Sequence, residues 1–297
     1  MFNSPYKVID TRKYNTWCKY KTRIDTYGCG CTHACHYCYA KALLNFRGLW
    51  NKEKPEISYI TEIEESISLL SKSEIVRLGS MTDCFQPIES VEMVTYQTIK
   101  LLNKYKINYL IVTKSCLVSD DRYVDIYDND LAHFQISITS TGDNKSLEYE
   151  NTSLVSDRIK SIEKLYRMGF DVSIRLSPFL YQYVDFEILN NIKCNKILIE
   201  FLKVNHWVKK SFKIDYSEYT FKYGGHENLP LSKKIELVNK ITGFEQVSIG
   251  EYVKEHHKYF SENVNYNKQD CCNLDIRFIQ NEPEQISLIY EIESLTN

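Results

Sequence analysis

The chain has 297 residues, with 37 lysines and arginines against 39 aspartates and glutamates, and it contains ten cysteines. This cysteine content lies well below the roughly 8–10% of a disulfide scaffold, and the near-neutral charge excludes a globally basic nucleic-acid binder. A nucleic-acid partner would therefore need a local basic patch or cleft. Because the sequence has no apolar run near 18 residues and no secretory signal at its start, we expect a cytoplasmic protein without a membrane span or disulfide partner.

Short β-branched or apolar runs recur along the chain and alternate with amphipathic stretches. The runs predict six strands, at Arg23–Tyr27, Glu74–Leu78, Tyr109–Thr113, Phe134–Ile138, Asp171–Leu176 and Lys196–Phe201. The stretches predict helices at Glu62–Leu70, Val91–Asn103, Val155–Met168, Phe186–Asn191 and Ser232–Ile241. This order predicts an α/β fold with parallel strands, either barrel-like or doubly wound, with its site at the carboxyl ends of the strands.

The domain organisation follows from where this alternation begins and ends. We expect an N-terminal extension over residues 1–22, an α/β core over 23–205, and a C-terminal extension over 206–297. The last of these lacks the regular alternation, and we expect it to bind substrate and to close a barrel.

The first predicted strand is followed by a loop, residues 28–40, that holds four cysteines and two histidines. Cys31, Cys35 and Cys38 have the spacing C-x3-C-x2-C, which lets one short loop wrap three thiolates around an inorganic centre and leave a fourth position open. A closed zinc site that adds Cys29 or a histidine, and buried free thiols, are the alternatives. The spacing favours the iron–sulfur cluster, because zinc knuckles usually divide their ligands into two separated pairs.

The segment from Cys31 to Ala40 resembles the cluster loop of radical S-adenosylmethionine (SAM) enzymes, including the aromatic Tyr37 before the third cysteine. Further segments resemble the branch of spore photoproduct lyase and its DNA-repair-photolyase-like relatives. These segments are 46–48, 79–89, 112–115 and 136–139. The resemblance covers about residues 23–205 and implies a partial (β/α)6 TIM-like barrel with a C-terminal extension.

The resemblance also implies the cofactors. Cys31, Cys35 and Cys38 would ligate three irons of a 4Fe–4S cluster, and SAM would chelate the fourth iron. An external electron donor of the flavodoxin or ferredoxin type would reduce the cluster. SAM would then be cleaved to methionine and a 5′-deoxyadenosyl radical, which abstracts hydrogen from the substrate.

Five residues match positions that contact SAM in the relatives: Tyr37, Thr82, Asp83, Lys114 and Ser137. Each also has an ordinary structural explanation. Thr82 and Asp83 can form a capping turn, Lys114 can be a solvated strand-end cation, and Ser137 can point away from the site.

Three further residues are candidates for the radical chemistry itself. Tyr37 and Tyr39 flank the last cysteine of the loop and can either relay a radical or pack on the cluster. The hydrogen-donating cysteine of spore photoproduct lyase corresponds here to Ser80, which argues against the lyase reaction. Cys84 is the candidate replacement donor, although a buried, inert thiol is the favoured interpretation.

Other polar residues are expected to serve the structure. We expect Arg158 and Glu200 to be members of ion pairs, and His33 and His36 to form hydrogen bonds beside the cluster. Cys271 and Cys272 could form a second metal site with Cys18, Cys29 or the histidines at 256–257, but buried thiols are favoured.

The substrate is less constrained than the initiating chemistry. The leading hypothesis is a radical SAM enzyme that acts on a nucleic acid or nucleotide, with 23 tyrosines available for stacking. Four lysines, at 203, 209, 210 and 213, could bind phosphate or form a solvated helix face. The alternatives are a radical SAM enzyme that modifies a peptide or small molecule, and a non-catalytic binding module stapled by zinc.

Overall fold

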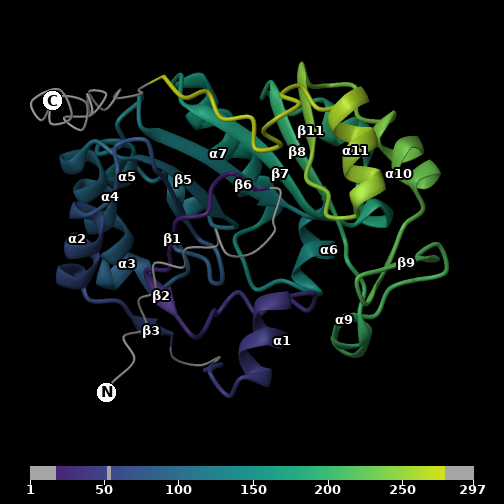
Figure 1. Cartoon of the computed structure of the whole chain (residues 1–297), viewed down its shortest axis with the longest axis horizontal. Coiled ribbons are helices and arrows are strands. Elements are labelled where there is room, and N and C mark those ends of the chain that lie inside the picture. The colour runs from purple at the N-terminus through teal and green to yellow at the C-terminus, as the bar shows by residue number, and fades with distance from the viewer. Residues whose placement is uncertain (1–17, 52–54, 278–297) are drawn as a thin grey trace, which may run out of the picture.

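The computed structural model describes residues 18–51 and 55–277, in which seven strands form one parallel sheet (Figure 1). In spatial order these strands are β1 (Arg23–Ile24), β4 (Ile75–Leu78), β5 (Asn108–Thr113), β6 (Ala132–Ile138), β7 (Asp171–Phe179), β8 (Lys196–Phe201) and β11 (Gln246–Ile249). Two antiparallel pairs lie outside this sheet: β2 (Tyr27–Gly28) with β3 (Glu56–Ile57), and β9 (Phe221–Tyr223) with β10 (His226–Asn228). The predicted α/β class with parallel strands is therefore confirmed.

The helices connect these strands and cover the sheet. They are α1 (Tyr39–Phe46), α2 (Ile60–Ser68), α3 (Glu89–Glu92), α4 (Val94–Tyr105), α5 (Asp121–Val124), α6 (Asp143–Leu147), α7 (Val155–Arg167), α8 (Phe186–Asn190), α9 (His206–Ser211), α10 (Leu231–Val238) and α11 (Lys254–Asn263). No helix in the described part of the chain is long and apolar enough to cross a membrane.

The helix predicted over 91–103 is divided in the structure. Met93 adopts a left-handed conformation with φ 53° and separates α3 from α4. The buried Glu89 carboxylate accepts hydrogen bonds from the backbone amides of Thr95 and Tyr96, both at 2.9 Å. A carboxylate at the first turn satisfies otherwise unpaired amides and suits the helix dipole, so α4 begins at this point.

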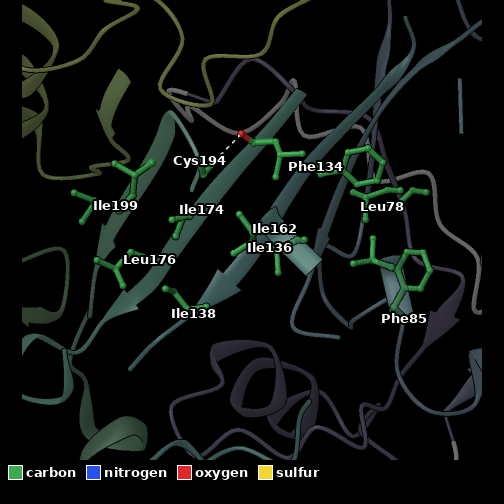
Figure 2. Packing of buried hydrophobic residues seen from close by; sticks show 14 of the residues in the cluster. Leu78, Phe85, Phe134, Ile136, Ile138, Ile162, Ile174, Leu176, Cys194 and Ile199 are labelled. Carbon is green, nitrogen blue, oxygen red and sulfur yellow. Dashed lines mark hydrogen bonds between the residues drawn. The ribbon is translucent and has the colours of Figure 1, made fainter. Parts of the chain in front are cut away.

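The sheet has two chemically different faces because successive side chains of a strand point to opposite sides. On β6, Phe134, Ile136 and Ile138 belong to the main hydrophobic core, and Figure 2 shows Ile162 of α7 beside Ile136. The alternate residues of the same strand are polar, and Gln135 is fully buried. Strand β7 repeats this pattern, and β8 does so except at Leu198, an apolar residue of the second face. The helices thus bury the aliphatic face, and the face that is polar on β6 and β7 lines the interior of the curved sheet.

The seventh strand, β11, was not predicted. It pairs in parallel with β8, from Gln246 opposite Lys196 to Ile249 opposite Ile199. Only four residues form it, in a part of the chain where the alternation of strands and helices had become irregular. The sheet therefore continues beyond residue 205, although the domain boundary expected there stays a prediction.

The segment after α11 returns to the amino-terminal ends of the strands. Lys196 donates to the carbonyl of Asn273 at 3.1 Å, and the amide of Asp275 donates to the Asp171 carboxylate at 2.8 Å. Because these contacts lie at the starts of β7 and β8, this segment covers the end of the sheet opposite the predicted site.

Candidate active site at the cysteine loop

The loop that carries the three cysteines connects β2 to α1. Cys29 and Ala34 adopt positive φ angles of 53° and 47°. A Cβ atom at Gly30 would lie 2.0 Å from the backbone oxygen of Asn51. Only glycine fits this close approach, so the conformation of the loop depends on Gly30.

Two residues that follow strands of the sheet fix the loop. The side chain of Gln86 accepts from the amide of Thr32 at 3.1 Å and donates to the carbonyl of Gly30 at 3.3 Å. Asn151 donates from its backbone to His33 at 2.7 Å and from its side chain to Thr32 at 3.0 Å. The loop is therefore attached to the segments that follow β4 and β6, at the carboxyl ends of the strands.

Three of the loop's four cysteines, Cys31, Cys35 and Cys38, are free, half-buried thiols. Cys38 is the N-cap of α1, and its sulfur accepts from the amide of Lys41 at 3.4 Å. Burial, together with charges that include that of Cys38, raises the pKa of both Cys31 and Cys35. Soft thiolate donors on one short loop, near enough to influence each other's ionisation, fit an iron–sulfur cluster, whose positive irons would favour the thiolate form.

No group of three or more His, Cys, Asp or Glu side chains within residues 18–51 and 55–277 is arranged to hold a single metal ion.

Tyr37 joins the loop to a buried ionic network. Its hydroxyl donates to the carboxylate of Glu150, which also accepts from Thr139 at 2.8 Å and from Arg158 at 3.0 Å. Burial opposes the charge of Glu150, but Arg158 and Lys114 outweigh it and lower the pKa of this carboxyl. The expected structural role of Arg158 is confirmed. The sequence could not identify Glu150 as its partner, because nothing in the pattern marks that residue.

Asp83 connects the loop to the end of β5. Its carboxylate accepts from the Thr113 hydroxyl and the Lys114 amide, both at 2.7 Å, and lies 3.4 Å from Nδ1 of His33. Burial opposes its charge, but these partners prevail and lower the pKa of Asp83 to about 2. The hydroxyl of Thr82 donates to the carbonyl of Tyr27. Both side chains therefore hold backbone at the site, and any contact of theirs with SAM stays a prediction.

Lys114 directly follows β5, Ser137 lies near the end of the neighbouring β6, and both are available for a ligand. The ammonium of Lys114 lies 5.8 Å from the ring centre of Tyr37 and forms no ion pair with a described residue. Ser137 is 2% exposed, and its carbonyl accepts from Arg158 at 2.8 Å. The hydroxyl of Ser137 forms no hydrogen bond with the described part of the chain. The positions of Lys114 and Ser137 are compatible with contacts to SAM, which stay a prediction.

The candidates for radical chemistry lie in different surroundings. Tyr39 is 61% exposed, and its hydroxyl donates to the carbonyl of Ser80 at 3.3 Å, while the Ser80 hydroxyl is buried without a described partner. Cys84 is 1% exposed and lies in the main core, and its sulfur lies next to Gly79. This placement favours the interpretation of Cys84 as a buried, inert thiol.

The interior face of the sheet contains an ion pair at the level of the site. Arg175 of β7 pairs with Glu200 of β8, and Glu200 also accepts from Ser177 at 2.7 Å. Burial opposes the charge of Glu200, but Arg175, Ser177, Arg77 and Lys203 together lower its pKa to about 2. The structural role expected for Glu200 is confirmed.

The remaining cysteines and lysines are distributed over separate sites. Cys18, Cys271 and Cys272 pack in one small cluster with apolar residues of the interior face, whereas His256 contacts Lys234 elsewhere. Among the four lysines of the expected patch, Lys209 pairs with Glu227 at 2.6 Å. His36 is exposed on the cysteine loop.

The sequence of this chain is similar to that of a known family and to that of a protein from another organism. The model of the Radical SAM superfamily matches residues 26–190, which is more than half of the chain. An uncharacterized protein of Methanocaldococcus jannaschii is 25% identical over 204 residues, which cover 63% of this chain and 75% of that relative.

Solved structures of radical SAM enzymes share the fold. A spore photoproduct lyase variant superposes with a TM-score of 0.57 at 16% identity, covering 82% of this chain and 79% of its own. Another variant, with bound AdoMet and dinucleoside spore photoproduct, has a TM-score of 0.56 at 15% identity with the same coverage. Methylornithine synthase has a TM-score of 0.51 at 11% identity and covers 76% and 63%. At such identities the likeness shows the fold, and it confirms the partial barrel.

Proposed function

Because this chain belongs to the radical SAM superfamily, we propose that Cys31, Cys35 and Cys38 hold a 4Fe–4S cluster whose open iron binds SAM. When bound and reduced by a flavodoxin or ferredoxin, this cluster supplies the electron that cleaves SAM and generates the hydrogen-abstracting 5′-deoxyadenosyl radical. The observation that carries the proposal is the three-cysteine loop fixed by Gln86 and Asn151 at the carboxyl ends of the strands. Family membership favours this cluster over a zinc staple, and a reducing cytoplasm suits its free thiols.

The surrounding residues have distinct proposed roles. The ammonium of Lys114, which pairs with no described carboxylate, suits the carboxylate of SAM, and the Ser137 hydroxyl suits a polar group of the same ligand. Asp83 fixes the backbone of Lys114, so that Thr82 and Asp83 present the strand ends to the methionine moiety. Tyr37 packs beside the cysteines, with its hydroxyl held by Glu150.

For the substrate, we propose a nucleic acid or nucleotide. The spore photoproduct lyase structures, one of which contains a dinucleoside photoproduct, share this fold over 82% of the chain. By the resemblance of residues 79–89, Ser80 corresponds to the hydrogen-donating cysteine of the lyase, so the proposed reaction differs from that of the lyase itself. A peptide or small-molecule substrate is the second candidate, which the fold shared with methylornithine synthase favours.

The cluster is tested by anaerobic reconstitution with iron and sulfide, followed by SAM cleavage under dithionite. We expect absorption near 400 nm and formation of 5′-deoxyadenosine, both lost in Cys35→Ala and retained in Cys116→Ala, which removes a thiol outside the loop. A colourless protein that binds stoichiometric zinc, or SAM cleavage that persists in Cys35→Ala, would contradict the assignment.

The substrate is tested by transfer of deuterium from labelled candidates into 5′-deoxyadenosine. We expect transfer from deuterated oligonucleotides or nucleotides in the reconstituted protein, and none in Cys35→Ala. Transfer from peptides or small metabolites alone would instead support the second candidate.

A further inference from the structure

Two arginines lie side by side on the interior face of the sheet. Strands β1 and β4 pair in parallel with Arg23 directly opposite Arg77. The next residues, Ile24 and Leu78, are fully buried in the main core that the helices cover. Because side chains alternate along a strand, Arg23 and Arg77 both point to the opposite face, into the interior of the partial barrel.

Neither arginine has a partner for its charge in the described part of the chain. Within residues 18–51 and 55–277, no ion pair involves Arg23 or Arg77, and the Nε atom of each is buried without a hydrogen-bond acceptor. A buried donor without an acceptor destabilises the fold, and two like charges opposite each other on neighbouring strands repel. The arrangement is unfavourable in the ligand-free protein and would be relieved by an anion between the two guanidinium groups.

The nearby carboxylates are already engaged. Glu200, whose pKa is lowered in part by the charge of Arg77, pairs with Arg175 and accepts a hydrogen bond from Ser177. Asp25, which is close enough to Arg23 for that charge to influence its pKa, accepts hydrogen bonds from the amides of Ser80 and Met81 at 3.1 and 3.0 Å. Neither carboxylate forms an ion pair with Arg23 or Arg77, so both guanidinium groups can bind a ligand.

The pair lies next to the site proposed for the radical chemistry. Ser80 lies two residues after the end of β4, and its carbonyl accepts from Tyr39, the residue after the last cysteine of the loop. An anion held by Arg77 would therefore lie in the interior, near the cysteine loop. Lys114 ends β5 and is the cation proposed for the SAM carboxylate, so this pair is available to another ligand.

We propose that Arg23 and Arg77 form an anion-binding subsite that holds a phosphate group of the substrate inside the partial barrel. The proposal rests on the proposed function and narrows its substrate to a phosphorylated one. Two adjacent guanidinium groups can each donate paired hydrogen bonds to the tetrahedral oxygens of a phosphate, which a neutral group cannot accept as strongly.

The test compares two probes that differ only in charge: a thymidine dinucleotide with its natural phosphodiester, and the same compound with a neutral methylphosphonate link. Binding is measured by anaerobic calorimetry on the reconstituted full chain with SAM and without reductant. We expect the wild type to prefer the charged probe by about tenfold to a hundredfold, the range for one charge-assisted hydrogen bond. The double variant Arg23→Gln/Arg77→Gln should lose this preference, and Arg167→Gln, on the exposed end of α7, should keep it.

Three results would overturn the proposal. They are equal binding of the two probes by the wild type, a charge preference that survives in the double variant, and weakened SAM binding in that variant, which would assign the pair to the cofactor. Competition separates the anion classes, since inorganic phosphate should displace the charged probe and acetate should not. If the double variant unfolds, Arg77→Lys replaces it in the test. This variant keeps the positive charge at position 77 but lacks the planar guanidinium group, so it should lower the preference for the charged probe without abolishing it.

The deuterium-transfer assay distinguishes a failure of this subsite from a failure of the proposed function. Transfer from oligonucleotides together with equal probe binding would refute the arginine subsite alone. Arginine-dependent binding of inorganic phosphate without transfer from any nucleotide would support the subsite and refute the nucleic-acid substrate.

Discussion

Replacing Asp171 by asparagine tests how the end of the barrel opposite the cysteine loop is held together. The Asp171 carboxylate lies at the start of β7 and is almost fully buried. It contacts Nδ1 of His133 and the ammonium of Lys196, each at 2.7 Å, and accepts from the amide of Asp275 at 2.8 Å. One side chain therefore joins β6, β8 and the segment that follows α11.

The size of this contribution follows from the pKa of Asp171. Burial opposes ionisation, but His133 and Lys196 outweigh it and lower the pKa from 3.8 to about 2. A lowering of nearly two units corresponds to about 2 kcal/mol in the free energy of unfolding. Because the folded-state pKa is lower than the unfolded one, this stabilisation is complete above about pH 5. About half of it is lost by pH 3, and nearly all of it once the pH falls below 2.

The assay is urea unfolding of the cluster-free chain at pH 6 and pH 3. At pH 6 we expect Asp171→Asn to lower the free energy of unfolding by about 3–5 kcal/mol, because it also leaves Lys196 buried without its carboxylate. The difference from the wild type should narrow by about 1 kcal/mol at pH 3. The control Asp157→Asn, which removes an exposed pair with Lys160, should change stability by less than about 1 kcal/mol. An equal deficit at both pH values would show that Asp171 is not the ionised centre of this contact.

Three further substitutions test the cysteine loop and the proposed cofactor site beside it. Gly30→Ala should prevent retention of the cluster, measured as iron content and absorption near 400 nm, whereas Gly142→Ala, which meets no atom within 4 Å, should retain it. Tyr37→Phe should lower the free energy of unfolding by about 1–3 kcal/mol, because it leaves Glu150 short of one buried donor, and retained turnover of the substrate would exclude an obligatory radical relay. Lys114→Met should weaken SAM binding about tenfold in equilibrium dialysis with the cluster intact, and unchanged affinity would remove Lys114 from the cofactor site.

The sequence predicted those features that depend on local pattern. The spacing of Cys31, Cys35 and Cys38 identified the loop, and the strands of the core were found because they combine β-branched or apolar residues and alternate with predicted helices. Strand β11 was missed, since only four residues form it in a part of the chain where the alternation of strands and helices is irregular. Its place in the sheet is set by pairing with β8, which is a tertiary contact.

The contacts of the site that were missed depend on strand register and on residues far apart in the chain. Nothing in the sequence places Arg23 opposite Arg77, because 53 intervening residues separate them and the alignment of β1 with β4 decides the pairing. Glu150 reaches Tyr37 across 113 residues. Sequence reasoning identified Arg158 as a member of an ion pair from its residue type, but only the fold supplies the carboxylate.

The two ends of the sheet's interior face differ in whether their charged side chains have partners within the protein. This difference indicates from which side a substrate enters. At the amino-terminal ends of the strands, the charges are matched within the protein, as Asp171 with Lys196 and His133 shows. Toward the carboxyl ends, Arg23 and Arg77 have no such partner among the residues that the structure describes. A closed end needs matched charges for stability, whereas an end that receives a ligand can leave part of its charge to be matched on binding. An anionic substrate would therefore enter from the side of the cysteine loop, where the hydrogen-abstracting radical is expected to form.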